Sequence, residues 1–314
     1  MQNLMTQHDL EALTVLACPA CRGRLFPVEP LGQVRCGSCR REYNYQGGIW
    51  RFLLPQQQAY YHPFLQNYRP ARQADGWERA DESYYLNLPE IAATDPQAPL
   101  WRLRRRSYAL LMQASGLGQG QYALDLGSGC GWLSRRLAEA GWRPLAFDLN
   151  LEGGDGLEGG AIYLEKAGVG FVRGQAAMHT LPLKDQTIAL GVANGSFHYT
   201  RPELVLPEIY RVLIPGGLFI INDSPVYTQA AAGRAMVSEL AARLQAKSGV
   251  NPVWPDGEGY LLLAETQNQL EKYGFEVQLR WPERPWSGAK RAARRLLHPG
   301  SRQQARFPLF LARK

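Results

Sequence analysis

Four cysteines near the start of the chain have the type and spacing of metal ligands. They form two Cys-x-x-Cys pairs, Cys18 with Cys21 and Cys36 with Cys39, and fifteen positions separate Cys21 from Cys36. Each pair makes a tight turn that aims two thiolates at one point, and two such turns make the tetrahedral four-sulfur site that zinc prefers. The sequence therefore predicts one structural Zn²⁺, with iron in the same geometry or an empty reduced site as alternatives.

A glycine-rich segment is the second place where residue type and spacing suggest chemistry. Residues 124–132 read Leu-Asp-Leu-Gly-Ser-Gly-Cys-Gly-Trp. Such glycines let the backbone approach a ligand closely, and amides at the start of the following helix can face an anion. A dinucleotide fingerprint needs glycine where Trp132 stands, which disfavours an NAD-dependent oxidoreductase. Asp148 follows about twenty residues downstream, where an acid can hold both hydroxyls of a ribose.

Two later loops carry residues that could act on a substrate. His198 is the best candidate for a general base, because its ordinary pKa is near neutral, and Tyr199 and Asp223 could orient an acceptor. Both loops follow expected strands, at the edge of an α/β sheet where ligands bind. The alternative is that His198 and Tyr199 only cap the preceding strand.

Strands and helices alternate after residue 121, which predicts a parallel, doubly wound α/β sheet that positions these loops. An Ala-rich helix near the end of the chain has Met236, Leu240 and Leu244 four residues apart, which predicts a core-facing stripe. The expected strands are 122–126, 144–149, 169–173, 187–193, 218–222, 275–281 and 307–312, and the expected helices are 132–140, 157–166, 203–213, 229–247 and 260–273.

The first hundred residues do not show this alternation of strands and helices, and they separate into a small module and a linker. Residues 11–54 alternate short apolar pieces with Cys, Gly and Pro turns, which indicates a small strand-rich module. Residues 55–99 are rich in Pro, Gln and Tyr without a sustained period, which indicates a linker with one short helix near 82–88. We expect a zinc-ribbon module at 1–58, a linker at 59–102 and one α/β domain at 103–314.

The glycine-rich segment, with the pattern Asp-x-Gly-x-Gly-x-Gly, resembles the first motif of class I S-adenosylmethionine-dependent methyltransferases. Residues 171–176 and 208–217 resemble the family's third strand and the entry to its fifth strand. The resemblance runs from about 103 to 314. It implies a seven-stranded Rossmann-like sheet of order 3-2-1-4-5-7-6, with strand seven antiparallel. It also implies that S-adenosylmethionine binds at Asp125, Gly127, Ser128, Gly129, Gly131, Asp148, Gln175, Ala176 and Asn194.

Two residues depart from the family's pattern. Gln175 stands where the family usually has an aspartate that meets the adenine amino group, and a Gln carbonyl can still accept that hydrogen bond. Ala189 stands where the fourth strand often carries Asp. Neither departure touches the glycine loop or Asp148, so we expect cofactor binding to survive. Asp125 could contact the cofactor or only orient the loop backbone.

The cysteine module resembles the zinc ribbon that activates tRNA methyltransferases, over about the first 55 residues. A ribbon before a methyltransferase domain also resembles bacterial 23S ribosomal RNA guanine-N1 methyltransferases. In those enzymes a histidine is the last zinc ligand, whereas this chain has Cys39. These likenesses keep RNA open as an acceptor.

Charge and composition indicate which kinds of partner and cellular location fit the chain. The net charge is +7, with basic residues concentrated at Arg102 to Arg106 and from Arg280 onward, which suits a phosphate-rich partner or a solvated basic face. No apolar stretch is long enough to span a membrane, and the N-terminus lacks a signal pattern, so we expect a cytoplasmic protein. The leading interpretation is a methyltransferase acting on a small molecule. Its alternatives are an RNA methyltransferase and a non-catalytic binding protein with the same fold.

Overall fold

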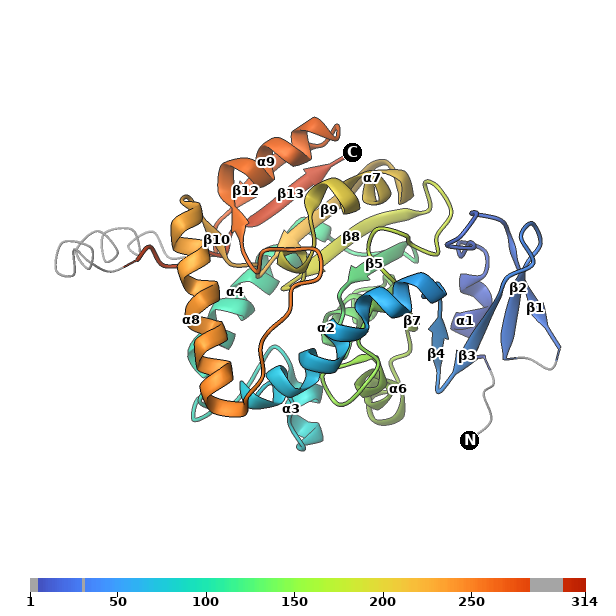
Figure 1. The fold of residues 1–314 in the computed structure, drawn as a ribbon. Helices are drawn as coiled ribbons and strands as arrows, with labels where there is room; N and C mark the ends of the chain where they lie inside the picture. Colours follow the sequence, from blue (N-terminus) through green and yellow to red (C-terminus); the bar gives the residue numbers. More distant parts are fainter. Residues whose placement is uncertain (1–4, 30–31, 283–301) are drawn as a thin grey trace.

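The computed structural model describes residues 5–29, 32–282 and 302–314, and Figure 1 shows their arrangement. One continuous sheet of eleven strands runs through the described molecule, in the order β1-β2-β3-β4-β7-β6-β5-β8-β9-β13-β12. The first four strands are β1 (Leu25–Val28), β2 (Gln33–Cys36), β3 (Glu42–Gln46) and β4 (Ile49–Arg51), and the rest are β5 (Tyr122–Leu126), β6 (Arg143–Asp148), β7 (Val172–Gln175), β8 (Ile188–Asn194), β9 (Leu213–Asn222), β12 (Glu276–Arg280) and β13 (Leu309–Arg313).

The expected strand order is confirmed within this sheet. Strands β7-β6-β5-β8-β9-β13-β12 correspond to 3-2-1-4-5-7-6, and β13 is antiparallel to both β9 and β12. The expected number of strands was wrong, because the sheet does not stop at β7. Strand β4 pairs with β7 in parallel, with Trp50 opposite Gly174 and Arg51 opposite Gln175. Strand β4, the last strand of the cysteine module, thus forms hydrogen bonds with backbone groups of β7 that would otherwise be unpaired at the sheet edge.

Helices cover both faces of the sheet, as a doubly wound fold requires. Leu111 of α4 and Leu133 of α5 pack on one face, against Val192 and Ile220. The other face buries a larger apolar cluster beneath α1, α7 and α9. The helices are α1 (Gln7–Ala12), α4 (Ala98–Ser115), α5 (Trp132–Glu139), α6 (Ala161–Ala167), α7 (Pro202–Val212), α8 (Ala230–Ser248) and α9 (Leu263–Lys272), with short 3-10 turns at Leu157–Gly160 and Phe197–Tyr199.

The segment expected to be mostly linker contains a long helix, α2 (Pro55–Ala74), before the expected short helix α3 (Glu82–Asn87). Prolines at 63 and 70 lie inside α2 and obscured its pattern. Its buried residues, Gln57, Tyr61 and Phe64, are nevertheless four and three positions apart, which places them on one helix face. Burial of Phe64 contributes about 1.5–3 kcal/mol to holding α2 on the domain.

The stripe expected on the Ala-rich helix is only partly buried. Leu244 is buried in α8, but Met236 and Leu240 are half-exposed, because α8 packs mainly against α2 and lies beside the sheet (Figure 1). The helix expected over 260–273 begins later, because Leu261–Leu262 forms strand β11 and pairs with β10 (Val226–Tyr227). Among the described residues, no helix is long and apolar enough to cross a membrane.

Candidate functional site

The four cysteines of the N-terminal module lie together. Sγ of Cys18 is 3.6 Å from Sγ of Cys39, and Sγ of Cys21 is 3.4 Å from Sγ of Cys36. All four sulfur atoms lie within 4.8 Å of one another. Tetrahedral zinc with bonds of about 2.3 Å places its sulfur ligands about 3.8 Å apart. The cluster therefore has the size and donor set of a four-thiolate metal site.

Two matching turns bring the thiolates into place. The amide of Arg22 donates to the carbonyl of Cys18 at 2.7 Å, and that of Arg40 donates to Cys36 at 3.1 Å. Both arginines have positive φ, 60° and 63°, so each turn closes in the left-handed region. At Gly23 a side chain would meet Sγ of Cys36 at 2.8 Å, so glycine is required beside the cluster.

Aromatic side chains connect the cysteine cluster to the α/β sheet. The Tyr43 hydroxyl lies 3.0 Å from Sγ of Cys18, and its ring packs on Phe52 with centroids 5.5 Å apart. Phe52 in turn meets the edge of Phe147 at 6.5 Å. The Phe52 amide also donates to the carbonyl of Gln175 at 2.9 Å. The module therefore extends the sheet beyond β7 and contacts β6 through Phe52 and Phe147.

The glycine loop after β5 is fastened to the neighbouring strand. The amides of Gly127 and Ser128 both donate to the carbonyl of Phe147, at 2.7 and 3.2 Å. Gly127 has a φ of 64°, and a side chain there would lie 2.4 Å from Cβ of Ser196, so only glycine fits. The Ser128 hydroxyl is buried and has no hydrogen-bond partner among the described residues. The loop thus presents an unsatisfied polar group at the carboxyl edge of the sheet.

Two acidic residues support this loop in different ways. Asp148 accepts hydrogen bonds from the amides of Gly129 at 2.8 Å and Asn150 at 2.7 Å, and burial raises its pKa to about 6. Asp125 is 1% exposed and accepts from the Ser134 hydroxyl at 2.7 Å, and burial raises its pKa to about 7. Asp148 lies at a pocket, whereas Asp125 is enclosed beneath the loop.

Two adjoining pockets open at this edge. The Asp148 pocket is lined from the sheet side by Phe147, Asp148 and Ala176, and α2 supplies aromatic rings to it. The Arg104 pocket lies beside it and is lined by the glycine loop, by Arg104 and Asp223, and by several aromatic residues. Gly127, Gly195, Tyr68 and Tyr199 line both pockets.

The cofactor and catalytic residues predicted from the sequence lie partly in the two pockets, partly in a neighbouring groove and partly outside them. Gln175 lines a neighbouring groove, and its side-chain amide donates to the Leu149 carbonyl at 3.0 Å. Asp125, Gly131 and His198 line neither pocket. The glycine loop and the later loops contribute Gly127, Ser128, Gly129, Asn194, Tyr199 and Asp223 to the Arg104 pocket, and Gly127, Asp148, Ala176 and Tyr199 contribute to the Asp148 pocket.

Asp223 is the most unusual group in the Arg104 pocket. It is 7% exposed with a φ of 51°, and neither carboxylate oxygen has a hydrogen-bond partner among the described residues. The closest cation is Nε of Arg104, at 4.0 Å from Oδ2. Burial raises the pKa of Asp223 to about 6, although Arg104 opposes that shift. A proton acceptor of moderate strength therefore faces the pocket.

His198 is less suited to act as a base. Its Nδ1 lies 3.2 Å from the Ser224 hydroxyl, and its ring packs against Tyr199 at a tilt of 37° with centroids 4.5 Å apart. Burial, together with Arg104 and Arg72, lowers its pKa to about 3. The imidazole is therefore neutral and weakly basic at pH 7, and its contacts are with Tyr199 and Ser224.

Helix α2 forms a wall of the site that sequence reasoning missed. Tyr61, Phe64, Tyr68 and Arg72 recur at helical spacing, and all four line one of the pockets. The hydroxyl of Tyr61 donates to Asp256 at 2.8 Å, which ties the start of the helix to a loop after α8. The recurrence of these residues on one helix face was the signal that could have identified them.

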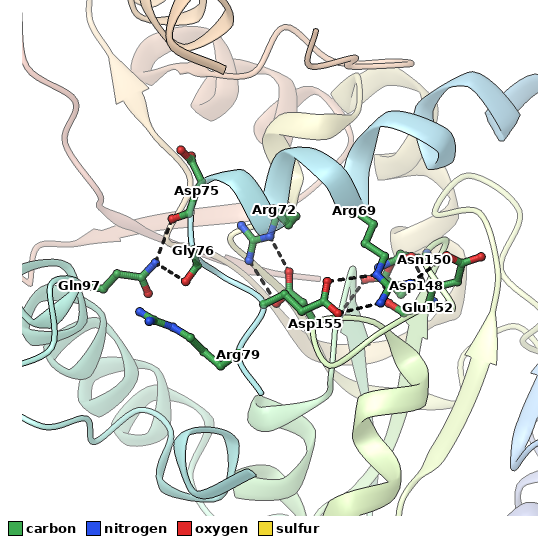
Figure 2. Close-up of polar contacts among 12 residues, drawn as sticks. Arg69, Arg72, Asp75, Gly76, Arg79, Gln97, Asp148, Asn150, Glu152 and Asp155 are labelled. Atoms are coloured by element: carbon green, nitrogen blue, oxygen red, sulfur yellow. Dashed lines mark hydrogen bonds and ion pairs between the residues drawn. The ribbon is translucent and has the colours of Figure 1, made fainter. Parts of the chain in front are cut away.

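The other end of α2 is held by ion pairs with the loop after β6. Figure 2 shows Arg72 reaching from α2 to Asp155, with Nε at 2.5 Å and Nη2 at 3.2 Å from its two carboxylate oxygens. Arg69, one turn earlier, pairs with Glu152 of the same loop at 3.5 Å and with Glu78 at 2.9 Å. Beyond the helix, Gln97 donates to the Gly76 carbonyl at 3.1 Å.

Residues 124–221 match the model of the methyltransferase domain family, which spans the glycine loop through strand β9. A curated relative, a demethylmenaquinone methyltransferase of Renibacterium salmoninarum, is 30% identical over 123 residues. The alignment covers 38% of this chain and 48% of that protein, so this chain spans about half the length of the relative.

Solved structures are similar over more of the chain. One is a geranyl diphosphate methyltransferase in complex with GPP and sinefungin. It superposes with a TM-score of 0.51 at 17% identity, and the match covers 81% of this chain and 99% of that one. The geranyl diphosphate C-methyltransferase of Streptomyces coelicolor gives 0.50 at 15% identity, covering 74% and 96%. The chain has the class I S-adenosylmethionine-dependent methyltransferase fold.

Proposed function

We propose that this chain is an S-adenosylmethionine-dependent methyltransferase whose acceptor is a small molecule. The observation that carries the proposal is the hydrogen bond from the Gly129 amide to the buried carboxylate of Asp148. It places a glycine turn and an acid at one point of the carboxyl edge of parallel strands, where nucleoside ligands bind in such sheets. The matched family model covers both residues.

The residues of the Asp148 pocket fit the cofactor. Each oxygen of the Asp148 carboxylate uses one lone pair on a backbone amide, which leaves acceptor capacity for ribose hydroxyls. Ala176, Met178 and Leu149 would surround the adenine. Gln175 lines the neighbouring groove, so its side chain would have to turn from the Leu149 carbonyl to meet the adenine amino group. The hydroxyl of Ser128, which has no hydrogen-bond partner among the described residues, would hold the methionine end.

The bound cofactor would supply a methyl group on a sulfonium. In such a transfer the acceptor's lone pair forms the bond to carbon, the carbon–sulfur pair goes to sulfur, and the acceptor's proton passes to a base. Asp223 is suited to take that proton, because its carboxylate is unpartnered and faces the Arg104 pocket. Tyr199 would close the junction between the two pockets, and His198 would position it.

The cysteine cluster would hold a structural Zn²⁺. Its four sulfur atoms have the spacing of a closed tetrahedral site, which leaves no position for water or substrate. The cluster belongs to the module that extends the sheet beyond β7, and Tyr43 and Phe52 lie between it and Phe147, so the metal would act by supporting β6 and β7.

Calorimetry with S-adenosylhomocysteine tests the cofactor site. Asp148→Ala removes charge-assisted hydrogen bonds to ribose, each of about 1.5–3 kcal/mol, so the affinity should fall at least tenfold. Glu165→Ala, an exposed acid on α6, is the matched control and should bind normally. An unchanged Kd for Asp148→Ala would contradict the assignment. Cofactor binding without methyl transfer to any metabolite or RNA extract would favour the non-catalytic alternative.

A further inference from the structure

We propose that the Arg104 pocket binds a small aromatic or conjugated acceptor that carries an anionic group, a carboxylate or a phosphate, and that Arg104 recognises this group. The inference rests on the proposed function and specifies its substrate class. The observations that support it are the position of Arg104, its lack of a close partner, and the aromatic walls around it.

Arg104 differs from the other arginines of α4. Arg102, Arg105 and Arg106 are exposed, and Arg105 pairs with Glu90 at the surface. The side chain of Arg104 is only 20% exposed and lines the pocket beside the glycine loop. Of the four arginines at 102–106, Arg104 is therefore the one whose guanidinium lines the pocket.

This inward guanidinium has no close anionic partner. The carboxylate nearest to it belongs to Asp223, 4.0 Å away, and Arg104 makes no hydrogen bond within the described residues. The neighbouring Arg72, in contrast, is bonded through two nitrogens to Asp155. A largely buried arginine whose nearest carboxylate is too far for a hydrogen bond is poorly compensated, and a bound anion would improve this with up to two parallel hydrogen bonds.

Aromatic rings complete the walls. The Arg104 guanidinium carbon lies 4.5 Å from the centroid of Trp77 and 5.0 Å from that of Trp101. Trp101 meets Trp132 at 5.8 Å and Tyr84 at 6.2 Å, both edge to face. Ring faces and edges at these angles favour a flat aromatic or conjugated molecule over a flexible aliphatic chain.

A flat anion would also be well placed for reaction. The same pocket contains Asp223 and the glycine loop, so a molecule anchored at Arg104 would lie next to the proton acceptor and the methionine end of the cofactor. A neutral acceptor would leave Arg104 with Asp223, 4.0 Å away, as its nearest counter-ion. The cofactor's own carboxylate is the other anion that could reach this arginine, and the experiment must distinguish the two.

The test uses the full chain saturated with S-adenosylhomocysteine, so that the cofactor's carboxylate is already in place. Ligand-observed NMR then measures binding of 4-hydroxybenzoate, phenyl phosphate and the neutral 4-hydroxybenzamide. At least one anion should bind about tenfold more tightly than the amide, and Arg104→Met should abolish that preference. Arg104→Lys should restore part of it, and Arg105→Met, a surface arginine of the same helix, should leave it unchanged.

Three results would overturn the inference. If neither anion binds better than the amide while S-adenosylhomocysteine binds normally, the acceptor class is wrong and the proposed function stands. If Arg104→Met weakens S-adenosylhomocysteine and leaves the anions unaffected, Arg104 serves the cofactor. If S-adenosylhomocysteine does not bind the wild-type chain, the proposed function itself fails. Melting curves of each variant confirm that it is folded.

Discussion

The guanidinium of Arg72 donates two hydrogen bonds to the carboxylate of Asp155, across 83 positions of sequence. This pair joins α2 to the loop that follows β6, and α2 carries Tyr61, Phe64 and Tyr68 over the pockets. The arginine side chain is 23% exposed and that of the aspartate 20%, so water screens the pair only in part. The pair is therefore one of the contacts that hold α2 over the pockets, beside the hydrogen bond from Tyr61 to Asp256.

Replacing Arg72 should loosen this cover. Arg72→Met leaves the partly buried Asp155 without its partner, which we expect to cost about 1–3 kcal/mol of stability. S-adenosylhomocysteine should bind more weakly because α2 lines its pocket. Denaturant unfolding and calorimetry would measure both effects. Arg69→Met removes the ion pairs with Glu78 and Glu152, and the arginine side chain is 39% exposed, so this control should cost no more than about 1 kcal/mol. Equal effects of the two variants would contradict this role of Arg72.

Asp223 should control the pH dependence of methyl transfer. Burial raises its pKa to about 6, and only the ionised carboxylate can accept a proton. The rate should therefore rise as pH increases from 5 to 7 and then level off. Asp223→Asn should lower kcat by about 100-fold or more while leaving S-adenosylhomocysteine affinity nearly unchanged. His198→Ala, tested in parallel, should keep the same pH profile. A profile that moves with His198 instead would identify the histidine as the base.

The buried carboxyl of Asp125 should make the stability of the protein depend on pH. Its folded pKa of about 7 is above the ordinary value, so the charged form is disfavoured by the fold. Its unfavourable contribution is absent below about pH 4, grows as pH rises, and is complete above pH 7, where it reaches at most about 4 kcal/mol. Asp125→Asn should therefore gain stability relative to the wild type as pH rises from 4 to 7. A difference in unfolding free energy that does not vary with pH would contradict the buried, poorly solvated carboxyl.

Metal removal should weaken cofactor binding at a distance. The contacts run from Cys18 through Tyr43 and Phe52 to Phe147, whose carbonyl holds the glycine loop. Stripping metal with a chelator, or Cys18→Ser, should lower the melting temperature and the affinity for S-adenosylhomocysteine together. Elemental analysis should give one zinc per untreated chain. Cys130→Ser removes a cysteine outside the cluster and should retain the metal.

An RNA acceptor and a small-molecule acceptor differ in how strongly salt should weaken their binding. Binding through several phosphates weakens steeply with salt, whereas a singly charged small molecule responds weakly. Filter binding of ribosomal and transfer RNA between low and moderate salt should show only weak, non-specific association. Tight, salt-dependent binding that is lost when Arg102, Arg105 and Arg106 become alanine would favour RNA. Most of the basic segment at Arg284 to Arg306 lies outside the described residues.

Local patterns predicted the parts of the site that are close together in sequence. The glycine loop and the acid at the end of β6 were found because turn chemistry and strand spacing identify them without tertiary information. The order of the central strands also followed from the resemblance. Helix α2 was missed because Pro63 and Pro70 interrupt its pattern, while the residues that face the pockets are aromatic or polar rather than aliphatic.

Tertiary environment accounts for what the sequence left open. The residue type of His198 suggested a base, but burial near Arg104 and Arg72 makes it a weak one. Arg104 looked like part of a surface cluster, although it follows the buried Trp101 by three positions on α4. The pairing of β4 with β7 joins segments more than a hundred residues apart, and no local pattern encodes such a register.

That pairing also has a consequence for solubility. A bare β7 would offer unsatisfied backbone groups to any neighbouring strand, and the N-terminal module covers them. The edge that remains is β1, a four-residue strand whose Pro27 cannot donate a hydrogen bond. At the opposite edge, β12 exposes Glu276, Gln278 and Arg280. A chain shortened to begin after the cysteine module should therefore self-associate through β7, even where its pockets remain intact.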